Sequence, residues 1–350
     1  MRFAVVLALA AALVVAATAS GHGAAPGVPR GFHPETAGAV GTRDVWILGW
    51  YRCKAGKPGC SALVRSTDGG RHFTRVAMPP LSNLNTPTLE FTSARVGYAA
   101  EAGSRLFVTH DGGSSWAPRS PAGLSEFAVG GGDVYAVFSP NRFERSPVSE
   151  SSWHTVTLPV KFRFLVSLAA QGRHVWLLGS TRHIRAGDMI VRSTDRGTTL
   201  EKGLGPCVPE LGGRLVPAGG EVVWAVCPTG MMAGLSLSTN GGRTFPLLRS
   251  FHDPGGSHLP GLTNGAAIFP SSKRDAVLYG GAQGPLVRTT DLGRRWAGVP
   301  QSARVGQVFW LHFATSRVGA ALFTTRSHPN QARFWRTTDG GLTWHSMAIR

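Results

Sequence analysis

The sequence predicts an all-β protein, a seven-bladed β-propeller of four-stranded antiparallel blades. Three observations carry this prediction: a turn motif that occurs six times, an apolar strand that occurs seven times, and a period of roughly 40–50 residues between copies. The 350-residue chain has 46 Gly and 23 Pro, and only 16% of its residues are charged. This composition favours short strands cut by tight turns over long helices.

The turn motif is an eight-residue string with Ser or Thr first, Asp or Asn third, Gly fifth and usually an aromatic residue eighth. Its third position is held by Asp68, Asp111, Asp195, Asn240, Asp291 and Asp339. A short Asp side chain and a Ser or Thr hydroxyl can both accept hydrogen bonds from backbone N–H groups a residue or two onward. Gly at the fifth position permits a positive φ. Each copy is therefore expected to be a structural corner between two strands and not a catalytic site.

The distances between copies give the number of units. Asp68 and Asp111 are 43 residues apart, whereas Asp111 and Asp195 are 84 apart, which is twice 42. A unit with a degenerate motif is therefore expected in the long gap, as the third blade. Residues 149–153 are its candidate turn, because they keep a Trp but have lost the Asp and the Gly.

An apolar strand before each turn supports the same period. Seven segments fit it: residues 44–48, 96–99, 133–137, 174–178, 222–226, 276–279 and 318–322. Seven such segments, with about four strands per unit, are typical of a propeller. Closing the units into a ring also covers the sheet edges that separate hairpins would expose.

The repeated string resembles the Asp-box, or BNR, repeat. Proteins of that family include sialidases, xyloglucan-degrading glycosidases, sortilin-type receptors and seven-bladed photosystem II assembly factors. The likeness covers nearly all of the chain after its first residues. It implies the propeller fold and structural Asp turns, but it implies little about activity, because this scaffold carries hydrolases and binding proteins alike.

A sialidase-like or other glycan hydrolase is the alternative to a binding protein. The Arg-Ile-Pro signature of the sialidase relatives is missing, and Tyr51, Tyr98, Tyr135 and Tyr279 lie on or just after the repeated strand. Few carboxylates remain outside the turns, and nothing in the sequence pairs two of them as a glycosidase requires. We therefore predict a binding or scaffold protein with no catalytic residue; a purely structural module is not distinguished from it.

The first residues indicate export. Residues 1–19 fit a signal peptide, with Arg2 at the start, an apolar run from Phe3 to Ala16, and small residues Ala17 and Ala19 before the expected cleavage point. An uncleaved membrane anchor is the alternative. Residues 20–350 then form a single propeller domain, secreted, periplasmic or associated with the cell wall.

The four cysteines fit an oxidising compartment. Of the three possible connectivities, the local pairs Cys53 with Cys60 and Cys207 with Cys227 are favoured. Neither spacing is that of a zinc site. No metal or other cofactor is expected.

The formal net charge of +17 gives the functional hypothesis. In this fold the motif turns lie on one rim, and ligands usually meet the opposite face, which is made by second-to-third-strand loops and inter-blade connections. The basic residues expected to bind there are Arg52, Lys54, Lys57, Arg142, Arg145, Arg182, Arg185, Arg326 and Arg333. The same loops also contain Lys161, Arg163, Lys202, Arg214, Arg249 and Arg304.

On the motif rim, by contrast, the turn aspartates offset the basic residues. The excess positive charge is therefore expected to attract an anionic partner, an acidic protein or an envelope polymer, to the opposite face. A generally Arg-rich composition is the alternative source of the charge. Nucleic acid is not expected, because the basic loops lack aromatic residues on which bases stack. The protein is expected to be a monomer without stable membrane insertion.

Overall fold

The computed structural model describes residues 27–53, 59–81, 87–138, 141–182, 187–207, 212–249, 261–281 and 284–350. The predicted signal peptide, residues 1–19, lies outside these ranges. Among the described residues, no helix has the length and apolar character needed to cross a membrane.

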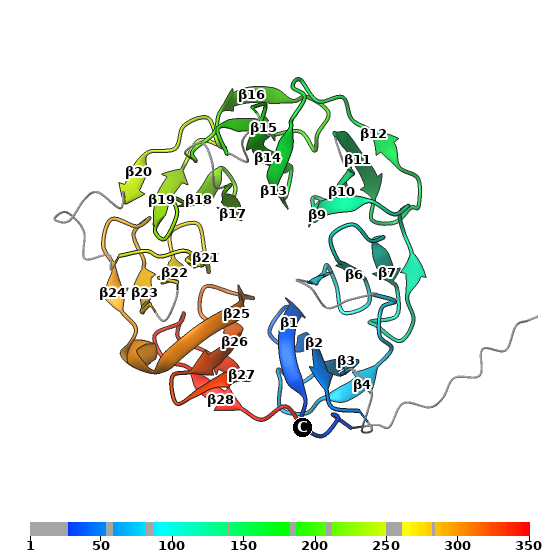
Figure 1. Cartoon of the computed structure of the whole chain (residues 1–350), viewed down its shortest axis with the longest axis vertical. Helices are drawn as coiled ribbons and strands as arrows, with labels where there is room; N and C mark the ends of the chain where they lie inside the picture. The colour runs from blue at the N-terminus through cyan, green and yellow to red at the C-terminus, as the bar shows by residue number, and fades with distance from the viewer. Residues whose placement is uncertain are drawn as a thin grey trace, which may run out of the picture.

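The described residues form seven four-stranded antiparallel sheets arranged in a ring (Figure 1), which confirms the predicted fold. We call the sheets blades 1 to 7. Blade 1 contains β1 (His33–Val40), β2 (Asp44–Tyr51), β3 (Cys60–Ser66) and β4 (Thr74–Val76). Blade 2 contains β5 (Thr88–Phe91), β6 (Gly97–Ala100), β7 (Phe107–Thr109) and β8 (Ala117–Pro118). Blade 3 contains β9 (Leu124–Gly130), β10 (Asp133–Phe138), β11 (Arg142–Pro147) and β12 (His154–Thr155), so the predicted third unit is present.

The remaining blades have the same strand order. Blade 4 contains β13 (Phe164–Gln171), β14 (His174–Ser180), β15 (Met189–Ser193) and β16 (Glu201–Leu204). Blade 5 contains β17 (Arg214–Gly219), β18 (Val222–Pro228), β19 (Ala233–Ser238) and β20 (Leu247–Arg249). Blade 6 contains β21 (Ala267–Pro270), β22 (Ala276–Tyr279), β23 (Leu286–Thr289) and β24 (Ala297–Gly298). A 3-10 turn, η1 (Pro300–Arg304), leads to blade 7, with β25 (Val305–Phe313), β26 (Gly319–Thr325), β27 (His328–Thr337) and β28 (His345–Met347).

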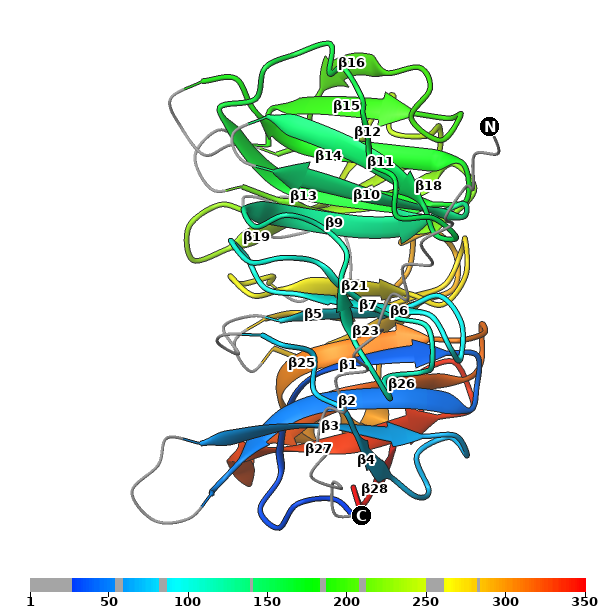
Figure 2. The same ribbon diagram turned by 90° about the vertical axis from the view of Figure 1, so that its right-hand side faces the viewer.

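Each blade is one continuous stretch of chain, and its strands run across the ring from one face to the other (Figure 2). The first strand of a blade lies nearest the centre and the fourth lies outermost (Figure 1). The second strand is the repeated apolar segment of the sequence and is buried on both sides; Trp46, Ile47 and Leu48 of β2 are fully buried. Neighbouring blades therefore share apolar clusters between their sheets.

The motif turns are built around hydrogen bonds from two side chains. In blade 1 the Ser66 hydroxyl accepts the Gly70 N–H at 2.8 Å, and Asp68 Oδ1 accepts the His72 N–H at 3.0 Å. The same two bonds occur in the other five copies. The side chain thus reaches four residues onward, farther than the one or two that the sequence suggested, because the turn wraps the chain around the carboxylate. Gly70 has φ +90°, and a Cβ there would also collide with the Phe334 ring.

The motif turns share one rim with the turns between first and second strands. In blade 1 the Gly69 N–H donates to Arg43 O at 2.8 Å, and the equivalent bond is present in every blade that carries the motif. We call this side the turn rim. The opposite side, made by second-to-third-strand loops and inter-blade connections, is the loop face.

The ring closes without a shared strand. The Phe73 N–H of blade 1 donates to Arg350 O at 3.0 Å, and Arg336 of β27 donates to Gly69 O at 2.9 Å and Thr42 O at 3.2 Å. Blades 1 and 7 lie side by side at this seam (Figure 1). Closure therefore rests on non-covalent contacts between the first and last blades.

Both predicted disulfides are present. Cys53 is bonded to Cys60, and Cys207 is bonded to Cys227. The first joins the two ends of the β2–β3 loop, and the second joins the connection that precedes blade 5 to strand β18. Both therefore stabilise the loop face.

Candidate binding site

Arginines on the turn rim are held by carboxylates and by neighbouring blades. Arg65 contacts Asp44 at 2.9 Å and donates to Ala94 O in blade 2 at 2.9 Å. Arg196 contacts the fully buried Asp133 at 2.7 Å. The positive charges of these two arginines are therefore compensated by carboxylates.

Arg145 lies on the turn rim and not on the loop face where the sequence placed it. Its side chain contacts Asp133 at 3.5 Å and donates to Arg196 O of blade 4 at 2.8 Å. The physical reason is the length of β11, which carries the chain across the ring between Arg142 at the loop-face end and Arg145 near the other. Arg145 is therefore a structural residue between blades 3 and 4.

A recurrent inter-blade arginine was missed in the sequence analysis. The residue before the first motif position, or its equivalent in blade 3, is Arg in five of the seven blades: Arg65, Arg145, Arg192, Arg288 and Arg336. Three of these donate to backbone oxygens of the next blade. The recurrence was visible in the sequence, and it accounts for part of the net positive charge without any ligand.

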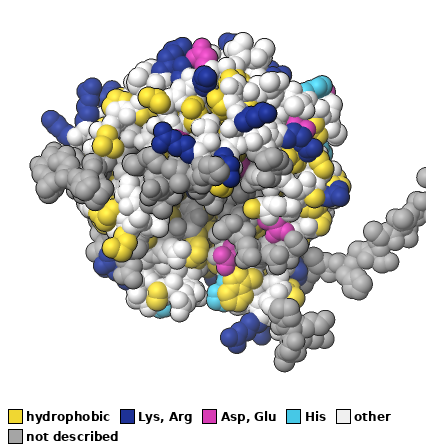
Figure 3. Space-filling model, turned by 45° about the horizontal axis from the view of Figure 1, so that its top comes forward, with side chains coloured by type: hydrophobic (Ala, Val, Ile, Leu, Met, Phe, Trp, Pro, Cys, Tyr) yellow, Lys and Arg dark blue, Asp and Glu magenta, His cyan; other side chains and the backbone are white. Residues whose placement is uncertain are grey.

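Two other predicted residues already have acidic partners on the loop face. Arg142 contacts Glu144 at 3.1 Å, and Arg182 contacts Asp188 at 3.4 Å. Arg52 is exposed at the end of β2. Figure 3 shows Lys and Arg side chains at separate points over the visible surface and not in one continuous field. Lys54, Lys57 and Arg185 lie outside the described residues.

The remaining two predicted residues, Arg326 and Arg333, line one hollow of about 600 Å³, which we call the outer hollow. Arg304, His328 and the aromatic side chains of Phe323 and Trp335 line it as well. No Asp or Glu is among the described residues that line it. Three arginines and a histidine therefore lie beside two aromatic side chains in this hollow.

Strand geometry explains why these groups meet. Side chains two apart on a strand share a face, so Arg333 and Trp335 of β27 both point into the hollow. Phe323 of β26 is paired with Arg333 and stacks on Trp335, with ring centroids 4.4 Å apart. The Arg326 N–H donates to Arg304 O at 2.9 Å, which fixes the end of η1 against the β26–β27 turn.

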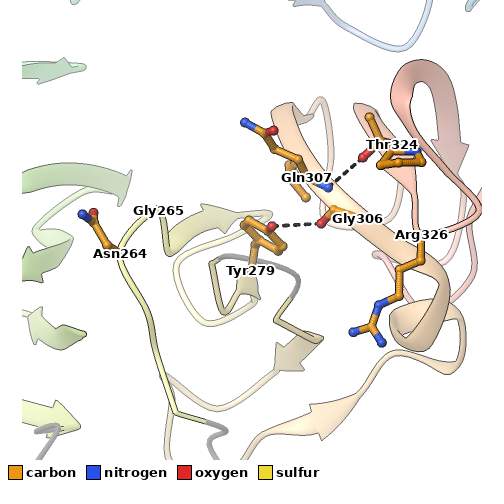
Figure 4. Close-up of a pocket in the computed structure, with 9 residues that line it drawn as sticks. Asn264, Gly265, Tyr279, Gly306, Gln307, Thr324 and Arg326 are labelled. Atoms are coloured by element: carbon orange, nitrogen blue, oxygen red, sulfur yellow. Dashed lines mark hydrogen bonds between the residues drawn. The ribbon is translucent and has the colours of Figure 1, made fainter. Parts of the chain in front are cut away.

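A second hollow of about 550 Å³, the inner hollow, shares Arg326 with the first. Figure 4 shows Arg326 at one end and the carboxamides of Asn264 and Gln307 toward the other. Its wall is fixed by the Tyr279 hydroxyl, which donates to Gly306 O at 2.9 Å, and by the Gln307 N–H, which donates to Thr324 Oγ1 at 2.8 Å. Alternation along β26 places Thr324 here and Phe323 in the outer hollow.

A third hollow, of about 400 Å³, lies among the inner strands of blades 2 to 5 and has a different chemistry. Glu101, Glu126 and Arg214 line it, and Glu101 is buried. Burial raises the pKa of Glu126 to about 7, although the Leu168 N–H and the charge of Arg214 act to lower it. Nothing in the sequence pairs these two carboxylates, because three different blades bring Glu101, Glu126 and Arg214 together.

No group of three or more potential metal-ligating side chains is present in the part of the chain that the structure describes. The prediction that no metal is bound remains a prediction.

Comparisons with known proteins give the fold. No protein-family profile matches the sequence, and no curated protein matches it. The solved structure described as YCF48 bound to D1 peptide is similar over 89% of this chain and 94% of that chain, with a TM-score of 0.57 and 15% identity. YCF48 from Cyanidioschyzon merolae is similar over 89% of this chain and 97% of that chain, with a TM-score of 0.56 and 12% identity.

A GH74 xyloglucanase from Xanthomonas campestris also matches, over 91% of this chain and 73% of that chain, at 13% identity. Its TM-score of 0.34 is too low to support an argument about this protein. The protein is a seven-bladed β-propeller whose fold resembles that of YCF48.

Proposed function

We propose that this protein is an exported, non-catalytic propeller that binds an anionic partner, an acidic protein or an envelope polymer, on its loop face. The observation that carries the proposal is the convergence of Arg304, Arg326 and Arg333 on one hollow without a described acidic residue in its lining. Three guanidinium groups gathered at one hollow attract anions.

Two further findings support parts of the proposal. YCF48, which has the same fold, has been solved bound to a peptide, so a propeller of this architecture can serve as a binding scaffold. The two disulfides are typical of proteins that fold in an oxidising compartment outside the cytoplasm. Export and the anionic partner are both part of the proposal.

A charge-reversal experiment tests the proposal. Binding of the purified protein to polyglutamate-coated and polyphosphate-coated beads would be measured from low to high salt. Reversal of three loop-face residues, Arg304→Glu with Arg326→Glu and Arg333→Glu, is expected to lower affinity at least tenfold and to flatten the salt dependence.

The matched control reverses three turn-rim residues, Arg71→Glu with Arg294→Glu and Arg295→Glu. This variant has the same net charge as the first, so bulk attraction falls equally in both. An equal loss of binding in the two variants would show that the loop face is not special and would contradict the proposal.

Glycan hydrolysis is the second candidate, favoured by one observation. Glu101 and Glu126 line the same hollow, and a carboxyl group whose pKa lies near 7 can act as a general acid at neutral pH. Turnover of aryl glycosides by the wild-type protein and its loss in Glu126→Gln would establish this activity. Absence of turnover by the wild type across uronide, sialoside and neutral glycosides would reject it.

A further inference from the structure

We infer that the outer and inner hollows together form a site for an extended acidic peptide that crosses Arg326. In this arrangement an acidic side chain of the peptide lies in the outer hollow, and its backbone continues into the inner hollow. The inference rests on the proposed function and narrows it to one region and one class of partner.

The two hollows share one lining residue. Arg326, in the tight turn between β26 and β27, lines both of them. Thr325 pairs with His328, so only Arg326 and Ser327 lie between the paired positions. The turn is held by the Ser327 hydroxyl, which lies 3.1 Å from the Thr325 hydroxyl and 3.0 Å from His328 Nδ1. Because the turn is short and hydrogen-bonded within itself, we expect it to be a rigid surface over which a peptide can lie.

The outer hollow has the chemistry of a carboxylate pocket. Arg304, Arg326 and Arg333 can each donate charge-assisted hydrogen bonds, and the guanidinium fork matches a carboxylate in geometry. Below them, Phe323 and Trp335 form an apolar, stacked floor. The Trp335 indole N–H already donates to Phe323 O at 3.3 Å, which leaves its ring as an apolar surface. The pocket therefore suits an acidic side chain with an apolar neighbour.

The inner hollow has the chemistry of a backbone-binding groove. Asn264 and Gln307 are exposed, and each carboxamide can both donate and accept a hydrogen bond, as a peptide unit requires. Gly306 keeps this wall close to β26, since a Cβ at that position would collide with Thr324 Oγ1. At about 550 Å³ and 600 Å³, the two hollows are of the size that binding pockets commonly have.

A peptide fits this region better than a regular polyanion. A polymer with evenly spaced charges gains affinity from a row of cations along its length. On the loop face, Arg142 and Arg182 have carboxylates within 3.1 Å and 3.4 Å, which lowers the net positive charge that a polymer would meet across blades 3 and 4. The cations converge instead beside aromatic and amide groups.

Fluorescence anisotropy with a labelled eight-residue peptide tests the inference. The probe contains two adjacent Glu residues beside a Leu, and the same peptide with Gln replacing Glu is its uncharged control. Arg304→Gln and Arg333→Gln are each expected to weaken binding of the acidic probe at least tenfold. Gln307→Ala is expected to weaken both peptides by a similar factor, because it acts on the backbone.

Arg182→Gln and Arg294→Gln are the matched controls, one on the loop face and one on the turn rim; each removes the same charge. Unchanged thermal unfolding would confirm that every variant folds. If Arg182→Gln weakens binding as much as Arg333→Gln, the peptide binds elsewhere on the loop face; the inference fails and the proposed function stands. If polyphosphate binds tightly and the acidic peptide does not, the partner is a polymer and the inference also fails. If neither probe binds the wild-type protein, both proposals fail.

Discussion

At the scale of a single residue, two motif turns can be compared, because the third position is Asp in one and Asn in the other. Asp195 accepts the Thr199 N–H at 2.8 Å and the Thr199 hydroxyl at 2.7 Å. Asn240, at the same position in blade 5, accepts the Thr244 N–H at 3.0 Å and donates to the Thr244 hydroxyl at 2.9 Å. The turn therefore forms with either a carboxylate or an amide oxygen of the third residue as the acceptor.

We predict that Asp195→Ala destabilises the fold by about 1–2 kcal/mol at pH 7, because it leaves backbone donors of the turn without their acceptor. Asp195→Asn should lose less than half of that, since blade 5 shows that the amide makes the same backbone bond. Urea unfolding of the two variants measures the difference. Equal losses would mean that the charge itself stabilises the turn.

The same carboxylate gives a pH dependence with a definite sign. The Thr199 N–H is the largest cause that lowers the pKa of Asp195, which falls to about 2 from its usual 3.8. A lowered folded-state pKa means that the stabilisation is present above about pH 4 and is lost as the pH falls toward 2. Asp195→Asn should therefore flatten the acid limb of the unfolding curve.

Arg145 shows where the sequence could not place a residue. Arg142 and Arg145 are three positions apart, and the sequence assigned both to the same loop. The assignment depended on where the third strand of blade 3 begins, and this blade has no complete turn motif to fix that boundary. In the other blades the motif fixed the rim correctly, because its turn geometry is local to the chain. The outer hollow, which combines η1, β26 and β27, depends on packing that no local motif specifies.

At the scale of secondary-structure elements, the disulfides act on loops of different length. Cys207 and Cys227 are 20 residues apart, whereas Cys53 and Cys60 are seven apart. The chain-entropy argument makes the longer closed loop the more stabilising by about 1 kcal/mol. The longer one also joins the chain before blade 5 to β18 in the interior of that blade.

We therefore predict that Cys207→Ala with Cys227→Ala lowers the free energy of unfolding by about 3 kcal/mol, and Cys53→Ala with Cys60→Ala by about 2 kcal/mol. Thermal unfolding of both double variants, with and without reductant, provides the measurement. Reductant should not affect a protein that lacks all four cysteines. A larger loss from the shorter loop would contradict the entropic explanation.

At the scale of the whole molecule, the seams between blades are not alike. Trp46 and Trp176 each donate an indole N–H across a seam at 2.8 Å, to Gly112 O and Gly241 O. Trp224 has the same place in blade 5, but its indole nitrogen has no hydrogen-bond partner among the described residues. In the apolar cluster between blades 5 and 6, Trp224 packs against Trp296 with ring centroids 6.1 Å apart.

Two substitutions should distinguish the seam between blades 7 and 1, which has arginine hydrogen bonds beside its apolar cluster, from the seam between blades 5 and 6. Arg336→Ala removes two hydrogen bonds across the seam between blades 7 and 1, and we expect a loss of about 1–3 kcal/mol. Trp296→Ala opens a cavity in the seam between blades 5 and 6, with an expected loss of about 3–5 kcal/mol. Hydrogen exchange should rise first in β1 and β28 for the former and in β18 and β21 for the latter. Increased exchange spread evenly around the ring in both variants would show that the seams do not open separately.

The unpaired indole of Trp224 also has a consequence for behaviour with temperature. Burial of apolar surface becomes a weaker driving force on cooling. Other seams also bury apolar clusters, but the indole hydrogen bond that supplements this burial at Trp46 and Trp176 is missing at Trp224 among the described residues. We therefore expect cooling to loosen the seam between blades 5 and 6 before the seams that keep this hydrogen bond. A melting temperature would therefore describe only the loss of stability on heating and not the loosening on cooling.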